Sequence, residues 1–201
     1  MSSEINAKTV KELRDKTGAG MMNCKKALQE NGGDFDKAIE FLRLKGMATA
    51  DKKSIRNANE GIIDTYIHTG NKLGILIEVN CETDFVARRK EFKDLVRNIG
   101  MQIASDPKIE IISFDDVSED LKELTRKFET NKEDIINKPK EIKDKIIEGR
   151  VNKILKTKVL LEQPYIRNPD ITVNELVKET ISLLGENIKI ARFVRYTLGE
   201  S

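Results

Sequence analysis

The segment from Leu73 to Arg88 constrains the fold of this chain more than any other stretch. Its first half is rich in apolar residues, with a period of two on one face that predicts a β-strand. One face of that strand carries Leu73, Ile75, Ile77 and Val79. The strand runs directly into Thr83-Asp84-Phe85-Val86, where the side-chain oxygen of Thr83 or Asp84 can cap the first turn of a helix. The sequence therefore predicts an acidic group and a large apolar ring at the exposed junction of a strand and a helix.

The first 46 residues predict three short helices that share one small core. Apolar residues at helical spacing place these helices at 9–18, 21–31 and 35–45. A capping box of Thr9 and Glu12 begins the first helix, and Asp34 caps the third. Glycine, the usual residue after a helix, follows the three at Gly18, Gly32-Gly33 and Gly46. Residues 47–59 contain few apolar groups, and we expect them to form a linker.

The remaining residues, 60–201, alternate between strand and helix patterns. Two Ile- and Val-rich strands, 61–68 and 73–80, flank a turn and predict a hairpin. Helices follow at 89–105, 118–136, 139–160 and 173–184, and a last strand spans 188–197. This order predicts an α+β fold with a small antiparallel sheet of about three strands, packed with helices and a helical hairpin. We therefore divide the chain into residues 1–46, 47–59 and 60–201.

Composition argues against several classes of function. The net charge is +2 although 35% of the residues are charged, whereas a nucleic-acid-binding surface favours a clear basic excess. Aromatic residues make up 5% of the chain and Trp is absent, which weakens a role in stacking on bases. No apolar run approaches the roughly 20 residues needed to span a bilayer. We expect neither a nucleic-acid partner nor a membrane partner.

The sequence also indicates a compartment. Cys24 and Cys81 are far apart in the sequence, so a disulfide framework is not expected and a reducing compartment fits. The first residues resemble neither a signal peptide nor a transit peptide, and we expect the protein to stay where it is made. Lys far outnumbers Arg and Ile is abundant, which fits an A/T-rich genome. Bacterial cytoplasm and plastid stroma both remain open.

Two long motifs carry a resemblance to a known family. The segment Glu78-Val79-Asn80-Cys81-Glu82-Thr83-Asp84-Phe85-Val86-Ala87 resembles the signature of elongation factor Ts. The earlier segment from Leu13 to Leu28, which includes Thr17-Gly18-Ala19-Gly20-Met21-Met22, resembles the N-terminal signature of the same family. This resemblance implies a guanine-nucleotide exchange factor for elongation factor Tu that supports translation elongation. It also implies a UBA-like (ubiquitin-associated) module at residues 1–46, a single copy of the family's core, and a homodimer.

The resemblance assigns the candidate contact residues. On pattern alone, Phe85 would pack into the protein's own core beside a helix cap. In the family, the matching Asp and Phe insert beside the nucleotide-binding domain of elongation factor Tu, so the role passes to Asp84 and Phe85, with Thr83 and Val86 in support. Met21 and Met22 could fill a core, but two successive helix positions face about 100° apart. The resemblance places both at the same partner.

Catalytic, metal and cofactor sites are not indicated. His68 is the single histidine and has no cluster of metal-ligating residues around it in the sequence. The glycine pairs at 18–20 and 32–33 lack the spacing of a phosphate-binding loop, so we expect no bound nucleotide, no cofactor and no enzyme activity. The alternative is a UBA-like protein-binding module without exchange activity, which leaves the motif at 78–88 unexplained.

Overall fold

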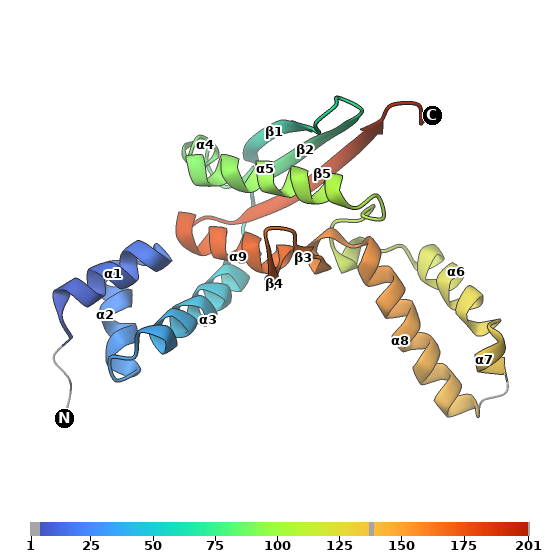
Figure 1. The fold of residues 1–201 in the computed structure, drawn as a ribbon, viewed down its shortest axis with the longest axis horizontal. Coiled ribbons are helices and arrows are strands. Elements are labelled where there is room, and N and C mark those ends of the chain that lie inside the picture. Colours follow the sequence, from blue (N-terminus) through green and yellow to red (C-terminus); the bar gives the residue numbers. More distant parts are fainter. Residues whose placement is uncertain (1–4, 137–138, 201) are drawn as a thin grey trace. The chain divides into compact units, whose positions relative to one another are not determined.

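The computed structural model describes residues 5–136 and 139–200 (Figure 1). Expectations that involve residues 1–4, 137–138 or 201, such as the reading of the first residues, lie outside the described part. The chain forms two compact units. The first comprises Met1–Asp64, Glu78–Val96 and Glu175–Ala191, and the second comprises Thr65–Ile77, Arg97–Asn174 and Arg192–Ser201. The expected division into 1–46, 47–59 and 60–201 stays a prediction.

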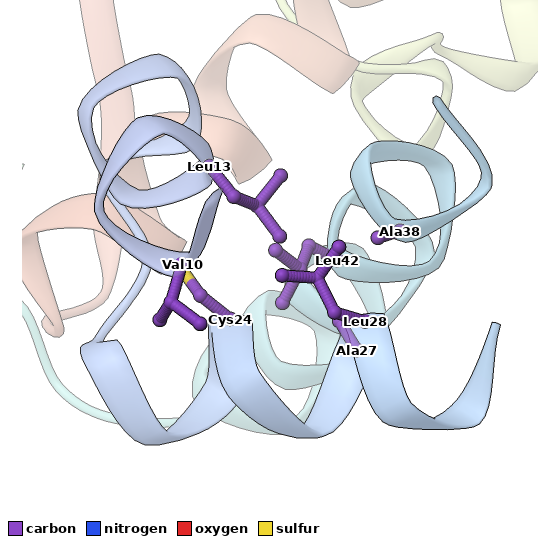
Figure 2. Close-up of a cluster of buried hydrophobic side chains, with 7 residues drawn as sticks. All are labelled: Val10, Leu13, Cys24, Ala27, Leu28, Ala38 and Leu42. Atoms are coloured by element: carbon purple, nitrogen blue, oxygen red, sulfur yellow. The ribbon is translucent and has the colours of Figure 1, made fainter. Parts of the chain in front are cut away.

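Three N-terminal helices share one apolar cluster, as the sequence predicts. They are α1 (Ala7–Thr17), α2 (Met21–Glu30) and α3 (Phe35–Lys53). Figure 2 shows the buried side chains that the three helices contribute to this cluster, namely Val10, Leu13, Cys24, Ala27, Leu28, Ala38 and Leu42. The core is small, so each of these side chains carries a large share of the stability of the module.

The ends of these helices are partly as predicted. Asp34 caps α3 by accepting from the backbone N–H of Lys37 at 3.0 Å. Gly18 ends α1 in a left-handed conformation with φ of 68°, which glycine adopts at little cost. The capping box of Thr9 and Glu12 is wrong, because α1 begins two residues before Thr9. The side chain of Asn6 caps it instead, accepting from the N–H of Lys8 at 3.0 Å.

The third helix does not stop at Gly46 as expected but continues to Lys53. A Cβ atom on Gly46 would lie 2.8 Å from the hydroxyl oxygen of Ser182. Gly46 therefore allows a close approach by a neighbouring side chain instead of ending the helix. A glycine inside a helix costs about 1 kcal/mol relative to alanine. The close approach of Ser182 explains why glycine occupies this position despite that cost.

The sheet contains β1 (Glu60–Ile67), β2 (Leu73–Cys81) and β5 (Ile188–Thr197) in the order β1-β2-β5. The hairpin and the third strand are therefore confirmed, and with them the α+β fold class with a three-stranded antiparallel sheet. Asn71 adopts a φ of 56° in the hairpin turn. The predicted apolar face of β2 is buried at Ile75, Ile77, Val79 and also Cys81.

Helix α5 (Lys90–Ser105) confirms the predicted helix at 89–105. The apolar residues at helical spacing are all buried, namely Phe92, Leu95, Val96, Ile99 and Ile103. The guanidinium group of Arg195 donates to the carbonyl oxygens of Asp106 at 2.7 Å and Pro107 at 2.6 Å. It also donates to Ile103, so a cation satisfies the carbonyl groups at the end of this helix.

A helical hairpin occupies much of the second unit. Figure 1 shows α6 (Glu119–Thr130) beside α8 (Lys140–Lys158). The predicted single helix at 118–136 is wrong in one respect, because the chain breaks after α6 and forms the short helix α7 (Glu133–Ile136). The carboxylate of Glu129 is buried at this break and pairs with Lys132 at 2.5 Å and Arg150 at 3.6 Å.

Two strands that the sequence did not predict, β3 (Pro164–Tyr165) and β4 (Asn168–Thr172), form a small hairpin. The buried amide of Gln102 holds it, donating to the carbonyl of Pro164 at 3.2 Å and accepting from the N–H of Ile166 at 2.8 Å. Helix α9 (Val173–Leu184) follows as predicted and ends at Gly185.

Candidate partner-binding site

The turn between β2 and α5 contains the first group of predicted contact residues. The short helix α4 (Asp84–Ala87) begins there, and Thr83 caps it because its hydroxyl accepts from the N–H of Val86 at 3.4 Å. Sequence left open whether Thr83 or Asp84 is the cap, and the structure assigns the cap to Thr83. We call residues 83–86 the Thr83–Val86 turn.

Phe85 points out of this turn into solvent. Its side chain is 77% exposed, whereas Val86 and Ala87 next to it are 6% and 5% exposed. The expectation from pattern alone, that Phe85 packs into the protein's own core, is therefore wrong. Two buried neighbours anchor the short helix, and the large apolar ring is left free for an intermolecular contact.

A carboxylate from the other end of the chain holds the base of the turn. The backbone N–H of Thr83 donates to Glu186 Oε2 at 2.9 Å, and the Thr83 hydroxyl donates to Glu186 Oε1 at 2.7 Å. Hydrogen bonds to an ionised acceptor are stronger than those between neutral groups. We call this pair of bonds the Glu186 bracket.

Asn187, next to Glu186, connects the same loop to two other segments of the chain. Its backbone N–H donates to the carboxylate of Glu82 at 2.6 Å. Its buried amide donates to the carbonyl of Arg56 at 2.7 Å and to that of Ser54 at 3.3 Å. Sequence reasoning missed Glu186 and Asn187, and the only local signal was their place directly after the helix stop at Gly185.

Cys81 supports the same turn as a neutral thiol. Its sulfur donates to the carbonyl of Thr83, with 3.1 Å between the two atoms. Burial, and secondarily the negative charge of Glu186, raises the pKa of Cys81 to about 11. At neutral pH the thiol is therefore protonated and a poor nucleophile.

Asp84 lies exposed at the start of α4. Its carboxylate pairs with Arg88 one turn later, with 2.6 Å between Oδ2 and the guanidinium nitrogen. The two side chains are 47% and 74% exposed, and exposed pairs of this kind contribute between 0 and about 1 kcal/mol. Asp84 can therefore exchange Arg88 for another partner at little cost.

Met21 and Met22 form the first turn of α2 and are both exposed, at 42% and 78%. Neither fills the core of the module, so the expectation that at least one points away from it is confirmed. Helix α2 begins after Gly20, and glycine offers no side-chain acceptor for the N–H groups of the first turn.

The loop before Met21 borders a cavity of about 390 Å³. Residues 16–19 line one side, α3 contributes Arg43 and Met47, and α9 contributes Glu179 and Leu183. Burial raises the pKa of Glu179, although the charge of Arg43 opposes that rise. The loop before α2 thus borders this cavity on one side.

In the described residues, 5–136 and 139–200, no group of three or more His, Cys, Asp or Glu side chains is placed to hold a metal. Nor does any helix within those ranges combine the length and apolar character needed to cross a bilayer. His68 is exposed at the end of β1, and its Nδ1 forms a hydrogen bond with the hydroxyl of Tyr66 at 3.1 Å.

Comparison with known proteins decides the family. The family model described as elongation factor TS matches residues 3–200. The chloroplastic elongation factor Ts of Phaeodactylum tricornutum is 68% identical over 200 residues, which cover 100% of this chain and 99% of the relative. The chloroplastic elongation factor Ts of Rhodomonas salina is 59% identical, with 100% and 91% covered. The elongation factor Ts of Rippkaea orientalis is 57% identical over 198 residues, which cover 98% of this chain and 80% of the relative.

The chain belongs to the elongation factor Ts family. As a member of that family it is a nucleotide exchange factor for elongation factor Tu in translation elongation, a role that involves no catalytic chemistry of its own. The relatives come from algal chloroplasts and from cyanobacteria, the two kinds of source that the sequence left open. The match along almost the whole chain agrees with a short form of elongation factor Ts.

Proposed function

We propose that the chain binds elongation factor Tu in its GDP-bound form through the Thr83–Val86 turn and through Met21 and Met22. The exposed ring of Phe85 is the observation that carries this proposal. A large apolar side chain on a fixed turn fits the anchors that dominate protein interfaces, which lie in fully desolvated pockets of the partner. Met21 and Met22 add a second contact, because flexible thioethers adapt to the surface they meet.

In this mechanism the ring of Phe85 enters between elements of the nucleotide-binding domain and displaces them. Asp84 leaves Arg88 and brings a negative charge beside the Mg²⁺ and phosphate contacts, which weakens them by competition and repulsion. Thr83 and Val86 keep the two side chains in place, the first by its hydrogen bonds and the second by its buried contacts. GDP then dissociates.

Linkage sets the energetic requirement. If the factor lowers the affinity for GDP by some ratio, GDP lowers the affinity for the factor by the same ratio. Each tenfold loss of GDP affinity requires about 1.4 kcal/mol of differential binding. Incoming GTP reverses the process and expels the factor, so one molecule can serve many partners.

Release of a fluorescent GDP analogue from elongation factor Tu tests the proposal. Catalytic amounts of the protein should accelerate release, and the rate should saturate as the concentration of the loaded partner rises. A folded protein that binds the partner without accelerating release would contradict the proposal and favour the UBA-like binding module without exchange activity.

We further propose that the protein acts as a homodimer. In the second unit, one face of the sheet exposes large apolar side chains from all three strands, namely Ile67, Leu76, Val194 and Tyr196. Val194 and Tyr196 are two residues apart and therefore share a face. A Cβ atom on Gly74 would lie 3.1 Å from Ile67, so the side chain of Ile67 lies over β2. Contiguous exposed apolar surface of this kind marks an interaction site, and a second copy offers the same face.

Sedimentation of the purified chain tests the dimer. The wild-type protein should sediment as a dimer, and the double variant Val194→Lys with Tyr196→Lys should sediment as a monomer with an unchanged circular dichroism spectrum. Lys189→Glu, on the first unit's part of β5, is a control for a change of charge on the same strand. A wild-type monomer at micromolar concentration would contradict the proposal.

A further inference from the structure

We infer that Glu186 is a positioning residue for nucleotide exchange, and that it acts by fixing the direction in which Phe85 projects. This inference rests on the proposed function, because it concerns the same turn. Glu186 follows α9 and Gly185, 103 residues after Thr83 in the sequence. Its carboxylate nevertheless accepts both donors that Thr83 offers, the backbone N–H and the hydroxyl.

The residues of the turn and of α4 have different functions, and this difference supports the role of Glu186. Val86 and Ala87 are buried, and their contacts hold α4 against the protein whatever happens at Thr83. Those contacts do not determine how the first turn of the helix is oriented. Orientation depends on Thr83, because its hydroxyl caps Val86 and its N–H lies at the junction with β2. Phe85 lies in the chain between Thr83 and Val86, the two residues that this cap joins, so the Glu186 bracket controls its direction.

Two parallel bonds from one residue to one carboxylate fix an angle as well as a distance. A single hydrogen bond would allow Thr83 to pivot about the acceptor, whereas a two-point contact does not. The neighbouring bond from the N–H of Asn187 to Glu82 at 2.6 Å holds the preceding residue to the same loop. Thr83 and the preceding Glu82 are therefore held by Glu186 and Asn187, which are successive residues of the loop after α9.

A fixed direction matters because exchange depends on differential binding. A freely pivoting ring can still bury itself against the partner, and it then binds the GDP-bound and nucleotide-free states almost equally. Such uniform binding shifts no equilibrium. A ring held in one direction displaces the elements of the partner that it meets. Its contact with the partner is therefore complete only in the state in which those elements have moved. Loss of the bracket should therefore lower the rate of exchange more than the affinity.

The test is Glu186→Gln, which keeps the size of the side chain but supplies only one acceptor oxygen. Nucleotide release from elongation factor Tu is measured over a range of concentrations of the GDP-bound partner. We expect the maximal rate to fall about tenfold, since small misplacements of positioned groups cost up to about 100-fold. The concentration at half-maximal rate should change by less than about twofold, with Tm near the wild-type value.

Matched variants distinguish positioning from a general loss of structure. Thr83→Val retains the N–H but removes the hydroxyl that donates to Glu186 and caps α4, so its maximal rate should fall at least as far as that of Glu186→Gln. Glu200→Gln makes the same change in charge at an exposed residue near the C-terminus and should leave exchange unaltered. Glu186→Gln should also have no further effect on exchange in the Phe85→Ala background, because a positioning residue acts only through the group it positions.

Each outcome has a distinct meaning. An unchanged maximal rate for Glu186→Gln, while Phe85→Ala is impaired, overturns the role of Glu186 and leaves the proposed function standing. An effect of Glu186→Gln that multiplies that of Phe85→Ala also overturns it, since Glu186 then acts by another route. If Phe85→Ala exchanges at the wild-type rate, the proposed function of the turn itself fails.

Discussion

The Thr83–Val86 turn and the start of α2 both present apolar side chains to solvent, but they are supported in opposite ways. Glu186 and Asn187 hold the turn through hydrogen bonds to its first residue, Thr83, and to Glu82 directly before it. The start of α2 follows a glycine and a loop that borders a cavity of about 390 Å³. The turn is held by side-chain hydrogen bonds, whereas the first turn of α2 has no side-chain cap. The difference suggests that the turn displaces parts of the partner, whereas α2 contributes affinity without dictating geometry.

The largest expected effect is that of Phe85→Ala. Removal of an anchoring aromatic side chain costs about 2 kcal/mol or more at an interface, which corresponds to a fall of about 30-fold in exchange. Since the ring is exposed in the free protein, Tm should be unchanged. The assay is release of the fluorescent GDP analogue, with Phe128→Ala as a control at another exposed phenylalanine. Exchange at the wild-type rate would remove the turn from the mechanism.

A smaller effect is expected when Met21 and Met22 are both changed to Ala. Loss of adaptable contacts should cost about 1 kcal/mol, or about fivefold in affinity for elongation factor Tu. The maximal exchange rate at saturating partner should stay close to that of the wild type. Calorimetric titration measures the affinity. Equal affinity of the double variant and the wild type would exclude α2 from the interface. A fall in the maximal rate would mean that the start of α2, like the Thr83–Val86 turn, also acts on the exchange step itself.

Gly20→Ser tests whether the missing cap matters. Gly20 already has extended backbone angles, φ −62° and ψ 145°, so serine fits and can cap the first turn of α2. The gain in stability should be a few tenths of a kcal/mol, a rise in Tm of about 1 °C. Thermal unfolding followed by circular dichroism measures it. Exchange should not change; a clear increase would show that α2 also needs a fixed geometry.

The smallest effect concerns Glu179 beside the cavity. Burial raises the pKa of this carboxyl in the folded protein, so its contribution to stability is full at low pH and declines as pH rises through that pKa. Glu179→Gln should therefore raise Tm by about 1–2 °C at pH 7, and the gain should vanish near pH 4. Thermal scans from pH 4 to pH 8 measure the difference. A gain that is independent of pH would indicate a change in packing instead of charge.

Sequence alone anticipated most of the helices and strands because their signals are local. Apolar spacing located α2, α5 and α9, and Ile- and Val-rich runs with a turn between them located the hairpin. The errors occurred where a distant contact decides the outcome. Gly46 looked like a helix stop, but the hydroxyl of Ser182 approaches it closely. The strands β3 and β4 depend on the buried amide of Gln102, more than 60 residues away.

The same limit applies to the candidate site. Thr83, Asp84, Phe85 and Val86 stand in one motif that a reader of the sequence can find, and so do Met21 and Met22. Glu186 and Asn187 form no motif with them, and a polar pair after a helix stop is common in loops. Only the folded chain brings the carboxylate of Glu186 to Thr83. The groups proposed to contact a partner were therefore predictable, and the groups proposed to orient them were not.

The separation between Thr83 and Glu186 in the sequence also has a consequence for the synthesis of the protein. The two residues are 103 positions apart, and chains emerge from the ribosome at about 5–20 residues per second. Glu186 is therefore synthesised about 5–20 s after Thr83. During that interval the nascent chain displays Phe85 without its support. On the proposed role of Glu186, the protein therefore becomes fully competent in exchange only after the loop that follows α9 has been synthesised.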